Sequence, residues 1–275
     1  MNAALVSVAL ALLAQNSSDE AALKELLYPF YGRQAAAYEF FKDPEHKQPL
    51  KLREQPVLTW TNAEQYMGAV FVWEYGGRPE VIGCIGSHQG EGRSNVFHEF
   101  HSLSLQPLQT VKFGGTGSWT PAKPGALMAV ATGAQAPADS ERQRLTQMRA
   151  IAREFRGWMK DNDDVTELRL LPQPIVRYSA PEQGVRDGAI FALVWKGTDP
   201  EILLVVEDRK HDAGDRWEYA LARFNFREMW AQRNDREVWR VEVARANKIY
   251  ITGVTGNFSH DAIRQEAGER EQKKP

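Results

Sequence analysis

Two continuously apolar runs in the second half of the chain form its most informative pattern. Residues 190–195 read Ile-Phe-Ala-Leu-Val-Trp, and residues 202–206 read Ile-Leu-Leu-Val-Val. A strand with one face in water alternates apolar and polar residues, whereas a strand that is buried on both faces does not. These runs therefore predict strands that are covered on both sides, by a helix on one side and by a second sheet or the wall of a shared cavity on the other.

A similar pattern lies earlier in the chain, at a nearly constant distance in sequence. Three pairs of segments carry the similarity: residues 50–61 and 168–179, residues 68–71 and 188–191, and residues 79–82 and 200–203. Farther along, Glu99 matches Glu218 and Trp119 falls on Trp239. Ordered matches at one offset indicate an internal duplication. The alternative is that strand–turn–strand segments resemble one another because they meet the same packing constraints.

The same pattern predicts an α+β fold in which the duplicated unit is a helix followed by an antiparallel sheet of about five strands. The two sheets would pack together or around a shared cavity. The first helix follows a capping-box spacing at Ser17 and Glu20, and the second, with an apolar face that runs on to Met159, follows one at Ser140 and Gln143. The boundaries place the first repeat at 15–133, the second at 134–258 and a polar, frayed or disordered tail at 259–275.

The first 14 residues are apolar apart from Asn2 and Ser7. A run of this length is too short for a transmembrane helix, which needs about 20 residues, and it has the length of the apolar part of a signal peptide. We therefore predict no transmembrane segment, cleavage near Ala14 and export to the periplasm or cell exterior of a bacterium. The alternative is an N-terminal core helix. Cys84 is the only cysteine, so no intrachain disulfide is expected.

Acidic and basic residues nearly balance, with 36 Asp and Glu against 34 Lys and Arg. A balanced chain carries no strong field of one sign, so nucleic acid is not an expected partner. The partner that the sequence allows is an unidentified small molecule or protein, and the oligomeric state stays open.

One candidate site is the segment His98-Glu99-Phe100-His101, which is one residue short of the helical His-Glu-x-x-His zinc motif. The segment has the pattern of a strand, and residues three apart on a strand point to opposite faces. His98 and His101 therefore cannot bind one metal ion together, and we expect no metal site. Glu99 is the candidate whose counterpart in the second copy, Glu218, is also a glutamate.

A second candidate is the densely charged loop 208–216, which lies between two apolar strands. Asp208, Arg209 and His211 could supply acid–base chemistry at the mouth of a cavity. The alternative is a solvated hairpin loop. No nucleophile elbow, phosphate-binding loop or dinucleotide fingerprint occurs in the chain, so the sequence implies no cofactor.

The segments 168–178 and 187–201 resemble stretches of bacterial exported proteins that carry no assigned function. The resemblance implies an exported protein and supplies no catalytic residues. The first functional hypothesis is a non-enzymatic protein that binds a ligand or partner between its two halves. The alternatives are a hydrolase or isomerase acting in a cavity between the repeats, and a structural envelope protein.

Overall fold

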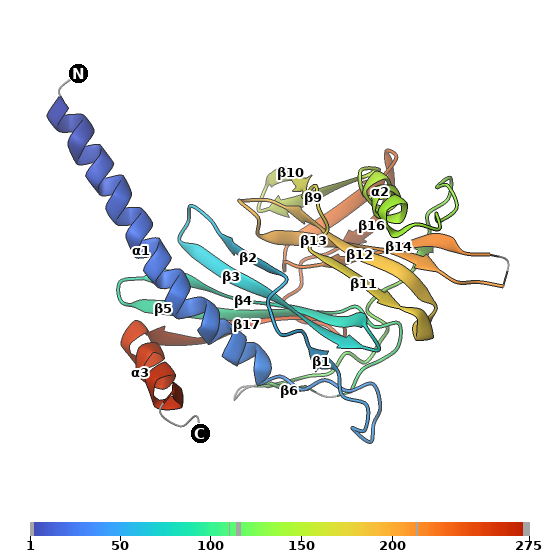
Figure 1. Ribbon diagram of the computed structural model, residues 1–275, viewed down its shortest axis with the longest axis horizontal. Helices are drawn as coiled ribbons and strands as arrows, with labels where there is room; N and C mark the ends of the chain where they lie inside the picture. The colour runs from blue at the N-terminus through green and yellow to red at the C-terminus, as the bar shows by residue number, and fades with distance from the viewer. Residues whose placement is uncertain (1–2, 110, 114–116, 213, 272–275) are drawn as a thin grey trace.

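The structure is a computed structural model that describes residues 3–109, 111–113, 117–212 and 214–271. Two antiparallel sheets pack face to face, and a helix covers the outer face of each. Figure 1 shows the first helix crossing the first sheet, the second helix lying on the other sheet and the third beside the first. The helices are α1 Ala3–Ala36, α2 Glu141–Ala152 and α3 His260–Glu271.

The first sheet has six strands in the order β1-β3-β4-β5-β17, with β2 also on β3. Their bounds are β1 Lys51–Leu52, β2 Leu58–Thr61, β3 Tyr66–Tyr75, β4 Arg78–Gly90, β5 Arg93–Ser102 and β17 Tyr250–Ser259. A separate two-stranded ribbon follows β5 and consists of β6 Val111–Phe113 and β7 Gly117–Trp119.

The second sheet has nine strands in the order β16-β15-β9-β10-β12-β13-β14-β8, with β11 also on β12, and it curls into a half-barrel. Its strands are β8 Ala129–Val130, β9 Phe155–Asp161, β10 Asp164–Leu170, β11 Val176–Ala180, β12 Val185–Val194, β13 Pro200–Arg209, β14 Arg216–Arg223, β15 Glu228–Arg233 and β16 Arg236–Val241. A 3₁₀ turn, Pro181–Gln183, joins β11 to β12.

The continuously apolar strands are covered on both faces, as their sequence predicts. Ile190 and Val205 lie in the cluster between the sheets, together with Val70 and Ile82 of the first sheet. Their neighbours on the same strands, such as Phe191, point the other way into the cluster beneath α2. A third cluster joins the outer face of the first sheet to α1.

The hydrogen-bonding register of β2–β3–β4–β5 recurs in β11–β12–β13–β14. Trp60 lies opposite Gly68 in the first sheet, and Tyr178 lies opposite Gly188 in the second. In both places the aromatic ring covers the glycine, because a Cβ atom on Gly68 or Gly188 would lie 2.7 or 2.6 Å from the ring. The same local packing therefore occurs in both halves.

The register corrects one predicted match. Phe97 faces Gly86 across β4 and β5, and Glu218 faces Glu207 across β13 and β14. Glu218 therefore corresponds to Phe97, and the counterpart of Glu99 is Ala220. The sequence match between Glu99 and Glu218 was two residues out of register, because isolated Glu-aromatic pairs recur easily in amphipathic strands.

The predicted boundary between the halves does not separate two self-contained sheets. The last strand of the chain, β17, joins the first sheet, where Thr252 pairs with Glu99. The short strand β8, which comes before the boundary at residue 134, joins the second sheet, where Val130 pairs with Glu218. Each half thus contributes an edge strand to the sheet of the other half.

Helix ends follow the sequence prediction in one case and depart from it in the others. Ser140 caps α2 by accepting a hydrogen bond from the backbone N–H of Gln143. Helix α2 ends at Ala152, so the predicted apolar helix face up to Met159 is instead partly strand β9. Helix α1 begins at Ala3 and runs through Ser17, so the first capping box does not start it.

Residues 260–271 of the polar tail, for which the sequence predicts a frayed helix or disorder, form helix α3; residues 272–275 lie outside the described part. Ile263 of α3 is buried beneath α1, and Glu266 forms an ion pair with Arg33 at 3.4 Å. No helix in the described residues is both long and apolar enough to cross a membrane, which agrees with the sequence prediction.

Candidate functional site

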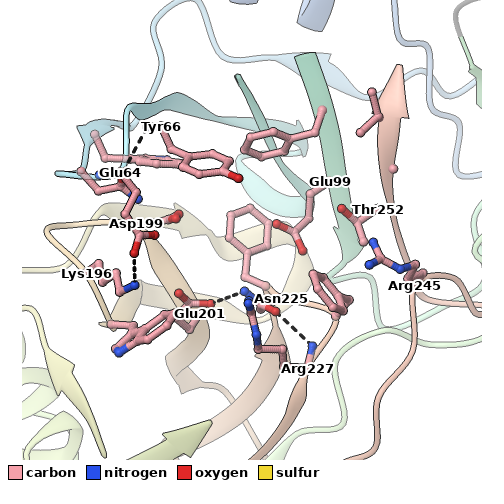
Figure 2. Close-up of a pocket in the computed structure, with 18 residues that line it drawn as sticks. Glu64, Tyr66, Glu99, Lys196, Asp199, Glu201, Asn225, Arg227, Arg245 and Thr252 are labelled. Atoms are coloured by element: carbon pink, nitrogen blue, oxygen red, sulfur yellow. Dashed lines mark hydrogen bonds and ion pairs between the residues drawn. The ribbon is translucent and has the colours of Figure 1, made fainter. Parts of the chain in front are cut away.

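A cavity of about 350 Å³ opens between the two sheets at the end where β13 begins (Figure 2). The turns after β2, β12 and β14 contribute to its walls, and β5 and β17 contribute from the opposite side. Six of its lining residues are aromatic: Trp60, Tyr66, Phe97, Trp195, Phe224 and Phe226. Four carboxyl groups also line it: Glu64 at the rim, and Glu99, Asp199 and Glu201.

Glu99 lies on the inner face of β5 and is 9% exposed. The hydroxyl of Tyr250 donates a hydrogen bond to its carboxyl group. Burial raises the pKa of Glu99 to about 7, against the smaller lowering effects of Tyr250 and Arg223. This carboxyl group therefore changes charge near neutral pH.

Glu201 and Asp199 flank Pro200 at the start of β13, and Figure 2 shows both in the cavity with Glu99. The amide nitrogen of Asn225 donates to Glu201 Oε2 at 2.6 Å. Burial raises the pKa of Glu201, and the neighbouring charges of Asp199 and Glu99 raise it further. Burial and Glu99 likewise raise the pKa of Asp199. The three groups are acids whose ionisation is opposed by burial and by one another.

The aromatic walls already hold cationic side chains of the chain itself. The Lys196 ammonium lies 4.0 Å from the centre of the Trp195 ring and forms an ion pair with Glu64 at the rim. The Arg245 guanidinium lies 4.0 Å from the centre of the Phe226 ring. Arg227 contacts the Trp195 and Phe226 rings from farther away, and its Nε forms an ion pair with Asp161 at 2.9 Å.

The opposite end of the sandwich is filled by ion pairs. Arg78 at the start of β4 donates from Nε to Glu207 at 2.8 Å, and Arg209 Nη1 donates to the same carboxylate at 2.6 Å. The Tyr178 hydroxyl also donates to Glu207, at 2.6 Å. Glu80 lies 3.0 Å from the Lys42 ammonium and 3.7 Å from Arg78. All of these groups are buried or nearly so.

The register relates the two ends residue by residue. The pairs Trp73–Val81 and Tyr75–Arg78 in β3–β4 place Glu80 and Arg78 where β12–β13 has Glu201 and Asp199. The same alignment places Gly86 where the second half has Glu207. The open end therefore keeps the glutamate of the closed end, and it has an aspartate in place of the arginine and a glycine in place of Glu207.

Of the residues that sequence analysis singled out, Glu99 alone lies in the cavity. His98 is on the opposite face of β5, hydrogen-bonded to Tyr38, and burial lowers its pKa to about 4. His101 is buried beside the carbonyl of Ser102, 2.7 Å from its ring nitrogen, and burial lowers its pKa to about 4. The alternation that separated these two histidines is confirmed.

The candidates of the charged loop belong to the ion-paired end. Asp208 faces the α2 side of its sheet and pairs with Arg186 at 2.7 Å. His211 Nε2 lies 3.0 Å from Glu218, and Arg209 lies 3.5 Å from Glu218 as well as pairing with Glu207. These residues brace β13 and β14, and they do not line the cavity.

Sequence analysis missed Asp199, Glu201 and Asn225. A signal was present, because the matched segments at 79–82 and 200–203 both contain a Pro-Glu step. The repeated Pro-Glu step marked Glu80 and Glu201 as equivalent positions, but it did not show whether a lysine or arginine lies beside either glutamate. Among the residues that the structure describes, no three His, Cys, Asp or Glu side chains are close enough together to hold a metal ion.

Comparisons with known proteins found no similar protein. No family model matches the chain, and no curated protein or solved structure is significantly similar to it.

Proposed function

We propose that the protein binds a small organic molecule in the cavity between its two sheets, without catalysing its conversion. The observation that carries the proposal is the difference between the two ends of the sandwich. The same register builds both ends, and one is filled by Arg78, Glu207 and Tyr178 while the other is open. A cavity of this size with aromatic walls and a few polar groups has the character of a small-molecule site.

The carboxyl groups support a binding role because they oppose stability. A buried acid without a compensating cation has a raised pKa and weakens the folded state once it ionises. Glu99 and Glu201 are both buried, and both have raised pKa values. Apolar residues at these positions would fill the cavity and stabilise the sandwich, so the carboxyl groups fit a role in recognition better than a role in folding.

We test this function by thermal shift against a panel of sugars, amines, carboxylic acids and lipids. A ligand that binds only the folded state raises the melting temperature by mass action. Thr252 lies on β17 opposite Glu99 and lines the cavity, so Thr252→Phe should fill it and abolish the shift. Thr252→Val changes the hydroxyl without adding volume and should keep it. Equal shifts in both variants would place the ligand elsewhere.

A hydrolase or isomerase acting in the same cavity is the second candidate function. Glu99, with a pKa of about 7, favours it, because a general acid–base group works best when its pKa is near the operating pH. If a ligand found in the screen is recovered chemically altered from the wild type and intact from Glu99→Gln, the catalytic function replaces the binding one.

We also propose that a helix-plus-sheet unit was duplicated to give the two halves. The repeated register and the paired Trp60–Gly68 and Tyr178–Gly188 contacts support this. Sequences of diverged homologues should align the two halves at these same positions. Alignment at other offsets would contradict the duplication.

Export remains a proposal, supported by the apolar stretch before residue 15 and by the resemblance noted above. N-terminal sequencing of the mature protein from a bacterial host should begin near Gln15 in the periplasmic or extracellular fraction. A chain that retains Met1 in the cytosol would contradict it.

A further inference from the structure

We propose that the cavity ligand is an organic cation whose ammonium group sits among Glu99, Asp199 and Glu201 and whose apolar body packs against the aromatic walls. This inference rests on the proposed binding function and specifies the class of ligand. Three observations carry it: the unpaired carboxyl groups, the missing arginine and the position of Lys196.

The first observation is that the arginines around the cavity do not form ion pairs with its three interior acids. The charge of Arg223 lowers the pKa of Glu99, and that of Arg227 lowers the pKa values of Asp199 and Glu201, from beyond ion-pair distance. Among the described residues, none of the three carboxyl groups forms an ion pair with a lysine or arginine within 4.0 Å. The nearby Arg227 is paired with Asp161 on the outer side, and Arg245 lies over Phe226. Glu201 is 3% exposed, so bulk solvent cannot screen it as it screens a surface carboxylate.

The second observation is the comparison with the closed end. There, Glu80 has Arg78 at 3.7 Å, and this arginine also neutralises Glu207. At the open end Glu201 stands in the place of Glu80, and Asp199 stands in the place of Arg78. One half therefore contains its cation within the chain, and the other has an acid at the corresponding position. A bound cation supplies the charge that the substitution removed.

The third observation is that the rim already binds an ammonium group in this way. The Lys196 ammonium lies 4.0 Å from the centre of the Trp195 ring and pairs with the Glu64 carboxylate. An aromatic face and a carboxylate together bind a cation through the ring quadrupole and direct charge. Away from the rings that Arg227 and Arg245 cover, the cavity offers the same two elements: its carboxyl groups and the rings of Trp60 and Tyr66, over which no lysine or arginine of the described residues lies.

Binding of a cation should change the protonation of the three carboxyl groups. A cation favours the ionised forms of the three carboxyl groups, which burial and mutual repulsion disfavour. Binding should therefore release protons at neutral pH, and affinity should rise with pH. The other charged and titratable groups around the three acids are Glu64, Tyr66, Cys84, His88, His101, Tyr250, Lys196, Arg223, Arg227 and Arg245.

The test uses the full chain and two matched pairs of probes in isothermal titration calorimetry. Choline is compared with its neutral carbon isostere 3,3-dimethylbutan-1-ol, and benzylamine with benzyl alcohol. We expect at least one cation to bind tenfold or more tightly than its neutral partner. Heats measured in two buffers of different ionisation enthalpy should show net proton release.

Variants then locate the site. Glu201→Gln keeps an acceptor for Asn225 and should weaken cation binding at least tenfold while leaving the neutral probes unchanged. Asp199→Asn serves as a second variant if Glu201→Gln does not fold. Glu167→Gln removes an exposed carboxylate of β10 that pairs with Arg156 of β9 outside the cavity, and it should leave binding as in the wild type.

Each outcome separates this inference from the proposed function. Neutral probes, sugars or acids could bind as tightly as the cations and lose binding in Thr252→Phe. That result would support the binding function and contradict the proposal that the ligand is an organic cation. Ca²⁺ or Mg²⁺ that binds in place of choline would overturn it too. If no amine binds, the inference fails; if the whole panel also fails, the binding function fails with it.

Discussion

The two ends of the sandwich have the same strand register, but only one of them pairs its buried carboxyl groups with cations of the chain. At one end Arg78, Arg209 and Tyr178 converge on Glu207, and the space between the sheets is full. At the other, Glu99 and Glu201 face a cavity. The difference teaches that two glutamates at the same register position, Glu80 and Glu201, can differ in compensation through one neighbouring residue, which is Arg78 at one end and Asp199 at the other.

The largest expected effect comes from removing the cation of the closed end. Arg78→Met leaves Glu207 and Glu80 with less compensation in a fully buried place, and breaking a buried pair in this way costs about 3–5 kcal/mol. Urea denaturation measures the loss. Arg240→Met, which removes an exposed ion pair with Glu237, should cost less than about 1 kcal/mol. If both variants lose a similar free energy of unfolding, the buried ion pair of the closed end contributes no more than an exposed one.

The next effect concerns Glu99 at the open end. Its pKa is about 7 in the folded state, so between its ordinary value of 4.5 and 7 the folded protein binds more protons than the unfolded chain. The free energy of unfolding therefore falls as pH rises through this window, by a maximum of about 3 kcal/mol. Glu99→Gln cannot ionise and should be more stable than the wild type at pH 8.

At pH 4 the same variant and the wild type should have nearly equal free energies of unfolding, because Glu99 is then protonated in both states. Urea titrations at the two pH values test this. A constant difference between the two proteins across pH would show that Glu99 ionises normally.

A smaller effect tests whether the two halves pack alike. An alanine at Gly68 or Gly188 would press its Cβ into the ring of Trp60 or Tyr178. Overpacking of this kind costs about 1–3 kcal/mol, and the two variants should lose similar amounts. Gly253→Ala is the control, because no atom lies within 4 Å of its added Cβ. If the two variants lose very different amounts of melting temperature, the two glycines are packed differently despite the shared register.

The smallest effect compares two tyrosine hydroxyls. Tyr178→Phe removes a hydrogen bond to Glu207, which pairs with two arginines, and should cost about 2 kcal/mol. Tyr250→Phe removes a hydrogen bond to Glu99, which is largely neutral below pH 7, and should cost about 1 kcal/mol there. A larger loss for Tyr250→Phe at pH 6 would indicate that Glu99 is charged.

Much of the architecture was predictable from local pattern. Runs such as residues 202–206 are too apolar for a strand with a wet face, so they required a second layer on each side. The matched segments at residues 68–71 and 188–191 gave equivalent strands because strand register follows the hydrophobic pattern. Residues 155–159 were assigned to the helix because Phe155 and Met159, which lie four apart, share a face on a helix as well as on a strand.

The site was less predictable because it depends on neighbours that are distant in sequence. The Pro-Glu steps at Glu80 and Glu201 look alike, and only the fold shows that one of them lies beside a lysine and an arginine. Glu218 was singled out because it resembled Glu99 in sequence, although its partner across the sheet is Glu207. The edge-strand pairing was also hidden, because the two residues of β8 carry too little pattern to indicate a partner.

The reciprocal placement of β8 and β17 has a consequence for the order in which the protein can assemble. Synthesis delivers β5 long before Tyr250–Ser259, so the β5 edge of the first sheet stays unpaired until β17 has left the ribosome. An unpaired edge is a surface on which nascent chains associate wrongly. A chain that stops before Tyr250 would carry this exposed edge permanently and should therefore aggregate.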